Sequence, residues 1–140
     1  MPDSPEVQRL KVLVVDDDPN IVTVVTAILR GEGFDVLEAT SGEQGLELAR
    51  TGSPDVVLLD IMMPEIGGFE VFRRLRLDPE TEGIPVIFLT ASMKPEHISR
   101  STEMGASGFI IKPFSPLALV NALKETCCLG GESSIVLKSF

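Results

Sequence analysis

The sequence predicts an α/β fold, a doubly wound five-stranded parallel sheet with five helices. Short aliphatic runs alternate with longer amphipathic segments, and this alternation recurs five times along the 140 residues, as expected for repeated βα units. Three of the aliphatic runs are nearly continuous, which is typical of parallel strands covered by helices on both faces. The length suits one domain that folds around its own core.

The strands are expected at residues 11–16, 34–39, 55–60, 85–89 and 108–111. The run 34–39 alternates apolar and polar residues more than the others, so we expect it at an edge of the sheet. Pro85 would open its strand, at a position where a missing N–H is tolerated.

The helices are expected between the strands, at 19–31, 42–51, 68–77, 95–104 and 116–127. Asp18 before Pro19 is typical of an N-cap followed by proline at the first helical position, and Ser41 can cap the second helix. Periodicity in the first helix predicts an inward face of Ile21, Val24, Val25, Ile28 and Leu29, which leaves Val22, Thr23 and Thr26 outward.

The domain is expected to span residues 9–127, after an N-terminal extension at 1–8. Residues 128–140 follow as a tail or linker for which we expect no partner element. Gly67 and Gly68 are interpreted as a flexible loop, because no phosphate-binding glycine spacing surrounds them.

Composition excludes several classes of function. The formal net charge is −9 and no cluster of basic residues offsets it, so we expect no direct binding of nucleic acid. The N-terminus lacks the basic start of a secretory signal, and no apolar run is long enough to span a bilayer. We therefore expect a cytoplasmic location and no membrane contact.

Polar side chains stand at the ends of the predicted strands, the edge where parallel sheets collect functional groups. They are Asp16, Asp17, Asp60, Thr90 followed by Ala91, and Lys112 followed by Pro113. Three carboxylates brought close together repel one another, so they either share protons or bind a cation. Oxygen ligands without His or Cys favour Mg²⁺, with Mn²⁺ possible.

Such a site is suited to receive a phosphoryl group. A divalent cation and Lys112 together approximately balance the three negative charges, and phosphoryl oxygens can be shared among the metal, Lys112 and the Thr90 hydroxyl. A carboxylate can itself be the nucleophile and form an aspartyl phosphate. Asp60, in the middle of the predicted sheet, is the best placed.

Four segments resemble the motifs of the receiver domain of two-component response regulators. They are the Asp16–Asp17 pair after VLVV, LLDIMMPEIGG around Asp60, FLTAS around Thr90 and GFIIKPF around Lys112. The resemblance runs from about residue 9 to 127. It implies a flavodoxin-like sheet with strand order 2-1-3-4-5, and it implies phosphorylation of Asp60 by a phosphohistidine on a sensor histidine kinase or a histidine phosphotransfer protein.

The resemblance also implies a metal-ligand set. Asp17 and Asp60 would bind Mg²⁺ directly together with the backbone carbonyl of Met62, and Asp16 would act mainly through a water. A homodimer through the fourth and fifth helices is a hypothesis that rests on the same resemblance.

The remaining implied roles concern the phosphoryl group and the switch. Thr90 and Ala91 would contact the phosphoryl group, and Lys112 would neutralise it. Phe109 would change rotamer when Thr90 moves, and the peptide bond from Lys112 to Pro113 would be cis.

Two alternatives stay open. An aspartate-nucleophile phosphatase would share the nucleophile, the metal and the lysine, but it needs a nearby second acid, commonly two residues after the nucleophile, where this chain has Met62. A receiver-like module could also bind partners without phosphorylation. We expect a phosphoacceptor and no enzyme beyond its own Mg²⁺-dependent phosphotransfer and dephosphorylation.

Overall fold

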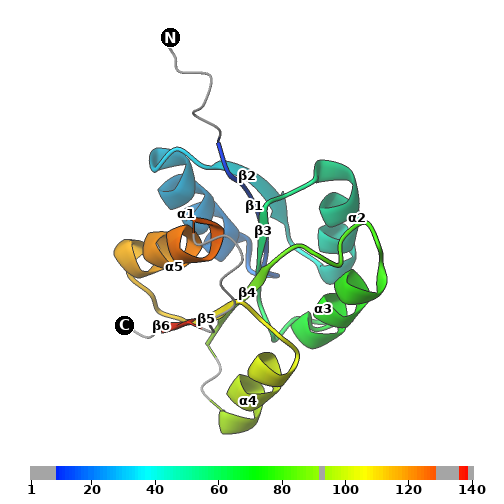
Figure 1. Cartoon of the computed structure of the whole chain (residues 1–140). Helices are drawn as coiled ribbons and strands as arrows, with labels where there is room; N and C mark the ends of the chain where they lie inside the picture. Colours follow the sequence, from blue (N-terminus) through cyan, green and yellow to red (C-terminus); the bar gives the residue numbers. More distant parts are fainter. Residues whose placement is uncertain (1–8, 92–93, 129–135, 139–140) are drawn as a thin grey trace.

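The structure, a computed structural model, describes residues 9–91, 94–128 and 136–138. A parallel sheet lies between two layers of helices (Figure 1). Its strands are β1 (Lys11–Val15), β2 (Asp35–Ala39), β3 (Val56–Leu59), β4 (Val86–Thr90), β5 (Gly108–Ile111) and β6 (Val136–Lys138). The helices are α1 (Pro19–Gly31), α2 (Gly42–Gly52), α3 (Gly68–Leu77), α4 (Pro95–Glu103) and α5 (Pro116–Cys128).

The strands lie in the order β2-β1-β3-β4-β5-β6, and every pair is parallel. The predicted five-stranded order 2-1-3-4-5 is confirmed, and β2 lies at an edge as expected. The expectation that the tail has no partner element was wrong for residues 136–138, which pair with β5. A βαβ crossover through α5 returns the chain to the start of β5, where a further parallel strand can add.

Both faces of the sheet are buried, as the continuous aliphatic runs predicted. Alternate residues of each strand point to opposite faces. Val12, Val14 and their neighbours on one face pack against α1 and α5. Leu13, Val15 and their neighbours on the other face pack against α2, α3 and α4 (Figure 1).

The start of α1 is fixed by local chemistry. The Asp18 side chain accepts a hydrogen bond of 2.9 Å from the Asn20 N–H, as predicted for an N-cap. In α2 the Ser41 hydroxyl likewise accepts from the Gln44 N–H at 3.1 Å. These caps place both helix starts, and therefore the loops after β1 and β2.

The predicted inward face of α1 was partly wrong. Val22 and Thr26 are buried, whereas Val24 is half exposed. The helix lies over β1 and β2, which turns the stripe containing Val22, Val25 and Leu29 toward the sheet. Neighbouring valines give this helix two apolar faces of similar strength, so periodicity alone could not choose between them.

None of the helices in the described ranges combines the length and the apolar character that crossing a membrane requires.

Candidate phosphoacceptor site

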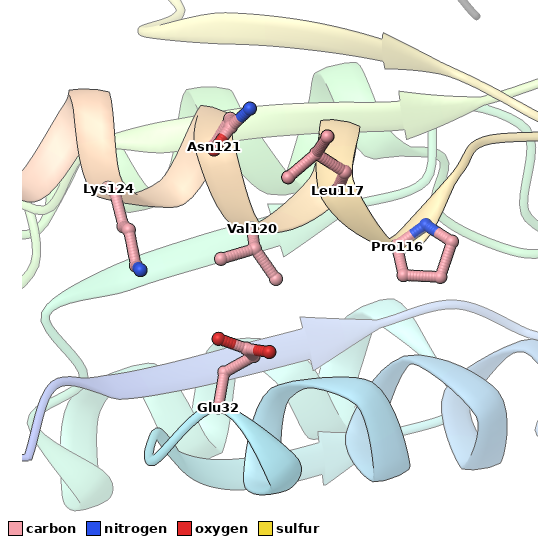
Figure 2. A pocket seen from close by; sticks show the side chains of 6 residues that line it. All are labelled: Glu32, Pro116, Leu117, Val120, Asn121 and Lys124. Carbon is pink, nitrogen blue, oxygen red and sulfur yellow. The ribbon is translucent and has the colours of Figure 1, made fainter.

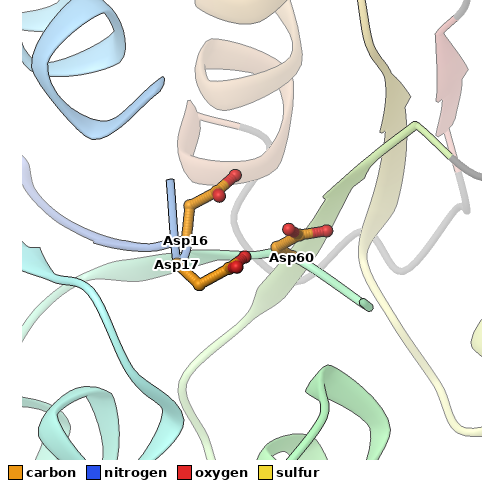
Figure 3. Close-up of side chains that lie close together, drawn as sticks. All are labelled: Asp16, Asp17 and Asp60. Atoms are coloured by element: carbon orange, nitrogen blue, oxygen red, sulfur yellow. The ribbon is translucent and has the colours of Figure 1, made fainter. Parts of the chain in front are cut away.

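The three predicted carboxylates meet at one edge of the sheet. Val15 and Leu59 are partners in adjacent parallel strands, so the residues that follow them, Asp16 and Asp60, leave the sheet side by side. The Asp60 N–H donates to the Val15 carbonyl at 3.0 Å. One oxygen from each of Asp16, Asp17 and Asp60 lies within 4.8 Å of the others, and Figure 3 shows the three side chains gathered together.

Burial differs among the three aspartates. Asp16 is 0% exposed and Asp60 is 5% exposed, whereas Asp17 lies at the surface. The carboxylate of Asp16 accepts a hydrogen bond from the Asp18 N–H at 3.0 Å, and that of Asp60 accepts one from the Met62 N–H at 3.3 Å. Two carboxylates therefore line the floor of the site, and the third faces solvent.

Lys112, which follows β5, reaches across the sheet to the same point. Its Nζ lies 2.6 Å from Asp16 Oδ2 and 3.5 Å from Asp60 Oδ2. The Lys112 N–H donates to the Thr90 carbonyl at 2.8 Å, which fixes where the side chain begins. The Lys112–Pro113 peptide bond is cis. The lysine thus pairs with Asp16 and also touches Asp60.

The surroundings of Asp60 change its acidity. Burial and, next, the negative charge of Asp16 raise the pKa of Asp60 from 3.8 to about 6, although Lys112 and the Met62 N–H act in the opposite direction. The ionised carboxylate is therefore costly to the fold but still predominates at neutral pH. A carboxylate of higher basicity is a better nucleophile than an ordinary aspartate.

The remaining predicted site residues lie on or just after strands β4 and β5, or follow Asp60 along the chain. Thr90, at the end of β4, is fully buried, and Ala91 after it is exposed. Phe109 is buried in β5, in register with Phe88 of β4. The Met62 side chain is 58% exposed beside Asp60.

The donor set suits a hard divalent cation. Three carboxylates and one ammonium leave a formal charge of −2, which a divalent ion would cancel. All the donors are oxygen atoms, the ligands that Mg²⁺ selects, and the exposure of Asp17 leaves room for the waters that Mg²⁺ retains. The described residues therefore form an acidic cluster fit for such an ion.

Gly68 is a residue of the site that sequence reasoning interpreted differently. It is not part of a flexible loop but the buried first residue of α3, and its N–H donates to the Ile61 carbonyl at 2.8 Å. A Cβ at this position would lie 2.2 Å from the Asp60 carbonyl oxygen, so only glycine allows α3 to begin there. Two glycines where a helix starts, which helix propensity disfavours, were the available signal.

An apolar hollow of about 440 Å³ adjoins the site. It is lined by three side chains of α1 and by residues that follow β4 and β5: Ile21, Val24, Ile28, Ala91, Lys112, Pro113, Phe114 and Pro116. Val24 is 50% exposed within it. A second hollow of about 270 Å³ lies further along α5 (Figure 2), lined by Glu32, Pro116, Leu117, Val120, Asn121 and Lys124.

The family follows from a comparison with known protein families. The model of the response regulator receiver domain matches residues 12–124. The chain belongs to this family. Receiver domains of two-component response regulators are a class whose members are switched between states by their own phosphorylation.

Relatives and solved structures agree with this assignment. The DNA-binding response regulator MtrA of Mycolicibacterium smegmatis is 42% identical over 115 residues, which cover 82% of this chain and 49% of that protein. The regulatory protein PhoP of Bacillus subtilis, named for alkaline phosphatase synthesis, is 40% identical over 106 residues, 76% of this chain and 43% of that protein. The chain thus spans about half the length of these curated relatives.

The fold is shared with solved receiver structures. The chemotaxis protein CheY4 of Vibrio cholerae superposes with a TM-score of 0.81 at 32% identity, and the match covers 85% of this chain and 99% of that one. A CheY-like receiver domain of Methanospirillum hungatei gives a TM-score of 0.80 at 29% identity, with 87% and 96% covered.

The relatives correct one expectation. MtrA is named as a DNA-binding regulator, and so is RpaA of Synechocystis sp., which is 40% identical over 116 residues, 81% of this chain and 48% of that protein. Excluding nucleic acid from the partners was therefore wrong for this kind of protein. The argument from a net charge of −9 concerned only residues that match about half of each relative. The charge of one part of a protein does not report what another part binds.

Proposed function

We propose that Asp60 accepts a phosphoryl group from a phosphohistidine and that this modification switches the binding of partners. The observation that carries the proposal is the position of Asp60 beside the Lys112 ammonium and the two other carboxylates. Its pKa of about 6 leaves the side chain ionised at neutral pH, as a nucleophile requires.

The transfer step is a displacement at phosphorus. A carboxylate oxygen of Asp60 forms the new O–P bond while the N–P bond of the phosphohistidine breaks, and the electron pair of that bond stays on the imidazole nitrogen, which takes up a proton. The Lys112 ammonium, 3.5 Å from Asp60 Oδ2, neutralises charge that the incoming phosphoryl oxygens bring. The product is an aspartyl phosphate.

Mg²⁺ completes the proposed site. Asp17, Asp60 and the Met62 carbonyl would hold the ion directly, and Asp16 would hold it through a water. When bound, Mg²⁺ supplies positive charge that offsets the carboxylates and the phosphoryl oxygens. Mn²⁺ would suit the same oxygen donors.

We assign the switch to residues of the next two strands and of the position just after β4. We assign Thr90 and Ala91, at the end of β4, to contact with the phosphoryl oxygens. Phe109, buried in β5, is assigned the change of rotamer that follows movement of Thr90. Because the new phosphoryl contacts exist in only one state of these side chains, phosphorylation shifts the balance between two states of the domain.

The apolar hollow beside Lys112 suits the donor protein. Its walls include the half-exposed Val24 and also Phe114, and a helix that buries these side chains would bring a histidine close to Lys112 and Asp60. Burial of exposed apolar surface is the usual source of affinity in such contacts.

The wider assignment is to a signalling protein, not to an enzyme that turns over an external substrate. The position two residues after Asp60 holds Met62, so no second acid is available there to protonate a leaving group. A cytoplasmic location, with a sensor kinase or phosphotransfer protein as donor, belongs to this proposal. The names of MtrA and RpaA favour control of DNA binding as the output of the whole protein.

Intact mass after incubation with acetyl phosphate tests the proposal. The chain should gain one phosphoryl group in Mg²⁺ and none in EDTA, and Asp60→Asn should gain none. Asp55→Asn is the matched control. Asp55 is an exposed carboxylate that directly precedes β3, whereas Asp60 directly follows β3 at the other end of the strand. This control should be labelled like the natural chain. Labelling of Asp60→Asn, or no labelling of the folded natural chain, would refute the assignment.

A further inference from the structure

Helix α4 has little buried surface of its own. Among residues 95–103, all of which the structure describes, Ser101 alone is buried, and its hydroxyl donates to the His97 carbonyl within the same helix at 2.8 Å. Ile98 and the following Met104 are partly buried against the core. A helix held by so few apolar side chains can shift at low cost unless another contact fixes it.

The Phe69 ring provides that contact. Its centroid lies 5.8 Å from the His97 ring in an edge arrangement, and the guanidinium carbon of Arg100 lies 4.6 Å from the centroid. Residues 97 and 100 are one turn apart on α4, so one ring touches the helix at two successive positions. The Phe69 centroid also lies 5.3 Å from the ring centroid of Phe88 of β4, again in an edge arrangement. Phe69 therefore joins α4 to the sheet.

Phe69 is also tied to the acidic site through the backbone. It follows Gly68, whose N–H bonds the Ile61 carbonyl at 2.8 Å, and a Cβ on Gly68 would lie 2.2 Å from the Asp60 carbonyl oxygen. No side chain separates the start of α3 from the backbone of Asp60. A displacement of the Asp60–Ile61 backbone must therefore move Phe69, because close-packed atoms cannot absorb it.

We propose that Phe69 is a positioning residue that couples the Asp60 loop to helix α4. Its ring holds α4 through His97 and Arg100, and its backbone follows the segment that packs on Asp60. The anchoring of α4 stands on the structure alone. The coupling to phosphorylation rests on the function proposed for Asp60.

Phe72 provides a matched control on the same helix. Its ring contacts Phe88 at 5.6 Å and lies under the Arg76 guanidinium at 4.4 Å, an environment like that of Phe69. Both of these neighbours belong to α3 or β4, so the Phe72 ring contacts described here do not involve α4. It is also fully buried, so Phe72→Leu should cost at least as much overall stability as Phe69→Leu.

Amide hydrogen exchange of the full chain at pH 7, without Mg²⁺ or phosphodonor, tests the anchoring. Each lost ring contact corresponds to a factor of roughly 2–10 in the opening equilibrium, so Phe69→Leu should speed exchange in residues 96–104 by about 5- to 30-fold. Arg100→Gln, a change at an exposed side chain, should speed it by about 2- to 5-fold. Phe72→Leu should not accelerate α4 relative to the sheet. Equal effects of the two Phe variants on α4, or no effect of Phe69→Leu, would overturn the proposal.

A second arm tests the coupling. Mg²⁺ and beryllofluoride, a phosphoryl mimic, should change α4 exchange in the natural chain and in Phe72→Leu, and the change should fall to less than half in Phe69→Leu. Intact mass after acetyl phosphate shows separately whether each variant is phosphorylated. If the natural chain takes no phosphoryl group, the function proposed for Asp60 is refuted. The exchange measurement without Mg²⁺ or phosphodonor still decides whether Phe69 anchors α4. If Phe69→Leu is phosphorylated and responds fully at α4, the coupling is wrong.

Discussion

Replacing Asp60 by asparagine should stabilise the metal-free protein at neutral and alkaline pH. Burial and the charge of Asp16 raise the pKa of Asp60 from 3.8 to about 6, which means that folding disfavours the ionised form. Each pKa unit corresponds to about 1.4 kcal/mol, so ionised Asp60 lowers the free energy of unfolding by up to about 3 kcal/mol. Asparagine has a similar shape and no charge, and we expect a gain of about 1–3 kcal/mol at pH 8.

The sign of the pH dependence follows from proton binding. Between pH 3.8 and about 6 the folded protein holds a proton on Asp60 that the unfolded chain has released, so the stability of the natural protein falls as pH rises through this window. Above this pH window the loss of stability caused by ionised Asp60 is constant, and below the window that loss vanishes. The advantage of Asp60→Asn should therefore be greatest at pH 8 and fall to about a third of that value at pH 4.5.

Urea unfolding in EDTA at pH 4.5, 6 and 8 measures this difference. EDTA is needed because a bound cation would stabilise the natural carboxylate. Glu103→Gln removes an exposed carboxylate of α4 and should change stability by less than about 0.5 kcal/mol at each pH. A gain for Asp60→Asn that is the same at all three pH values, or a loss at pH 8, would refute the electrostatic reasoning.

Three further outcomes test the same site. Lys112→Met leaves the fully buried Asp16 without the ammonium at 2.6 Å and should cost about 3–5 kcal/mol in urea unfolding; a cost below about 1 kcal/mol would show that the buried charge does not depend on this lysine. Gly68→Ala places a Cβ 2.2 Å from the Asp60 carbonyl oxygen and should cost about 1–3 kcal/mol, whereas Gly31→Ala, with nothing within 4 Å, should be neutral or slightly stabilising; equal effects would contradict the close packing. Mg²⁺ should raise the urea midpoint of the natural chain more than that of Asp60→Asn, and equal shifts would place the ion elsewhere.

The sequence was sufficient for the first five strands of the sheet because its signals are local. Continuous aliphatic runs such as that of β1, together with caps such as Asp18, specify where each strand and helix begins, and the parallel arrangement follows from their alternation. Since parallel strands end at a common edge, the sequence also predicted that Asp16 and Asp60 would meet. The structure confirms their proximity and adds the distances.

Other features depended on contacts that a single sequence does not specify. The buried face of α1 includes Thr26 because the helix lies over two strands, and periodicity treats threonine as polar wherever it stands. The pairing of β6 with β5 depends on where α5 returns the chain. The role of Gly68 depends on the close approach of the Asp60 carbonyl oxygen, and a sequence does not show which backbone atoms approach one another.

The energetics of the acidic cluster explain how one site can be both costly and useful. Asp16 and Asp60 are buried close together, and one ammonium does not neutralise both. The fold is therefore left with excess negative charge, which a divalent cation can relieve and which a phosphoryl group brought without a cation would increase. The electrostatic cost of the metal-free cluster and its affinity for a cation have the same origin. A substitution that lowers the electrostatic cost of the cluster must therefore also lower its affinity for a cation. This is why Asp60→Asn is expected to be more stable than the natural chain in EDTA and to gain less stability from Mg²⁺.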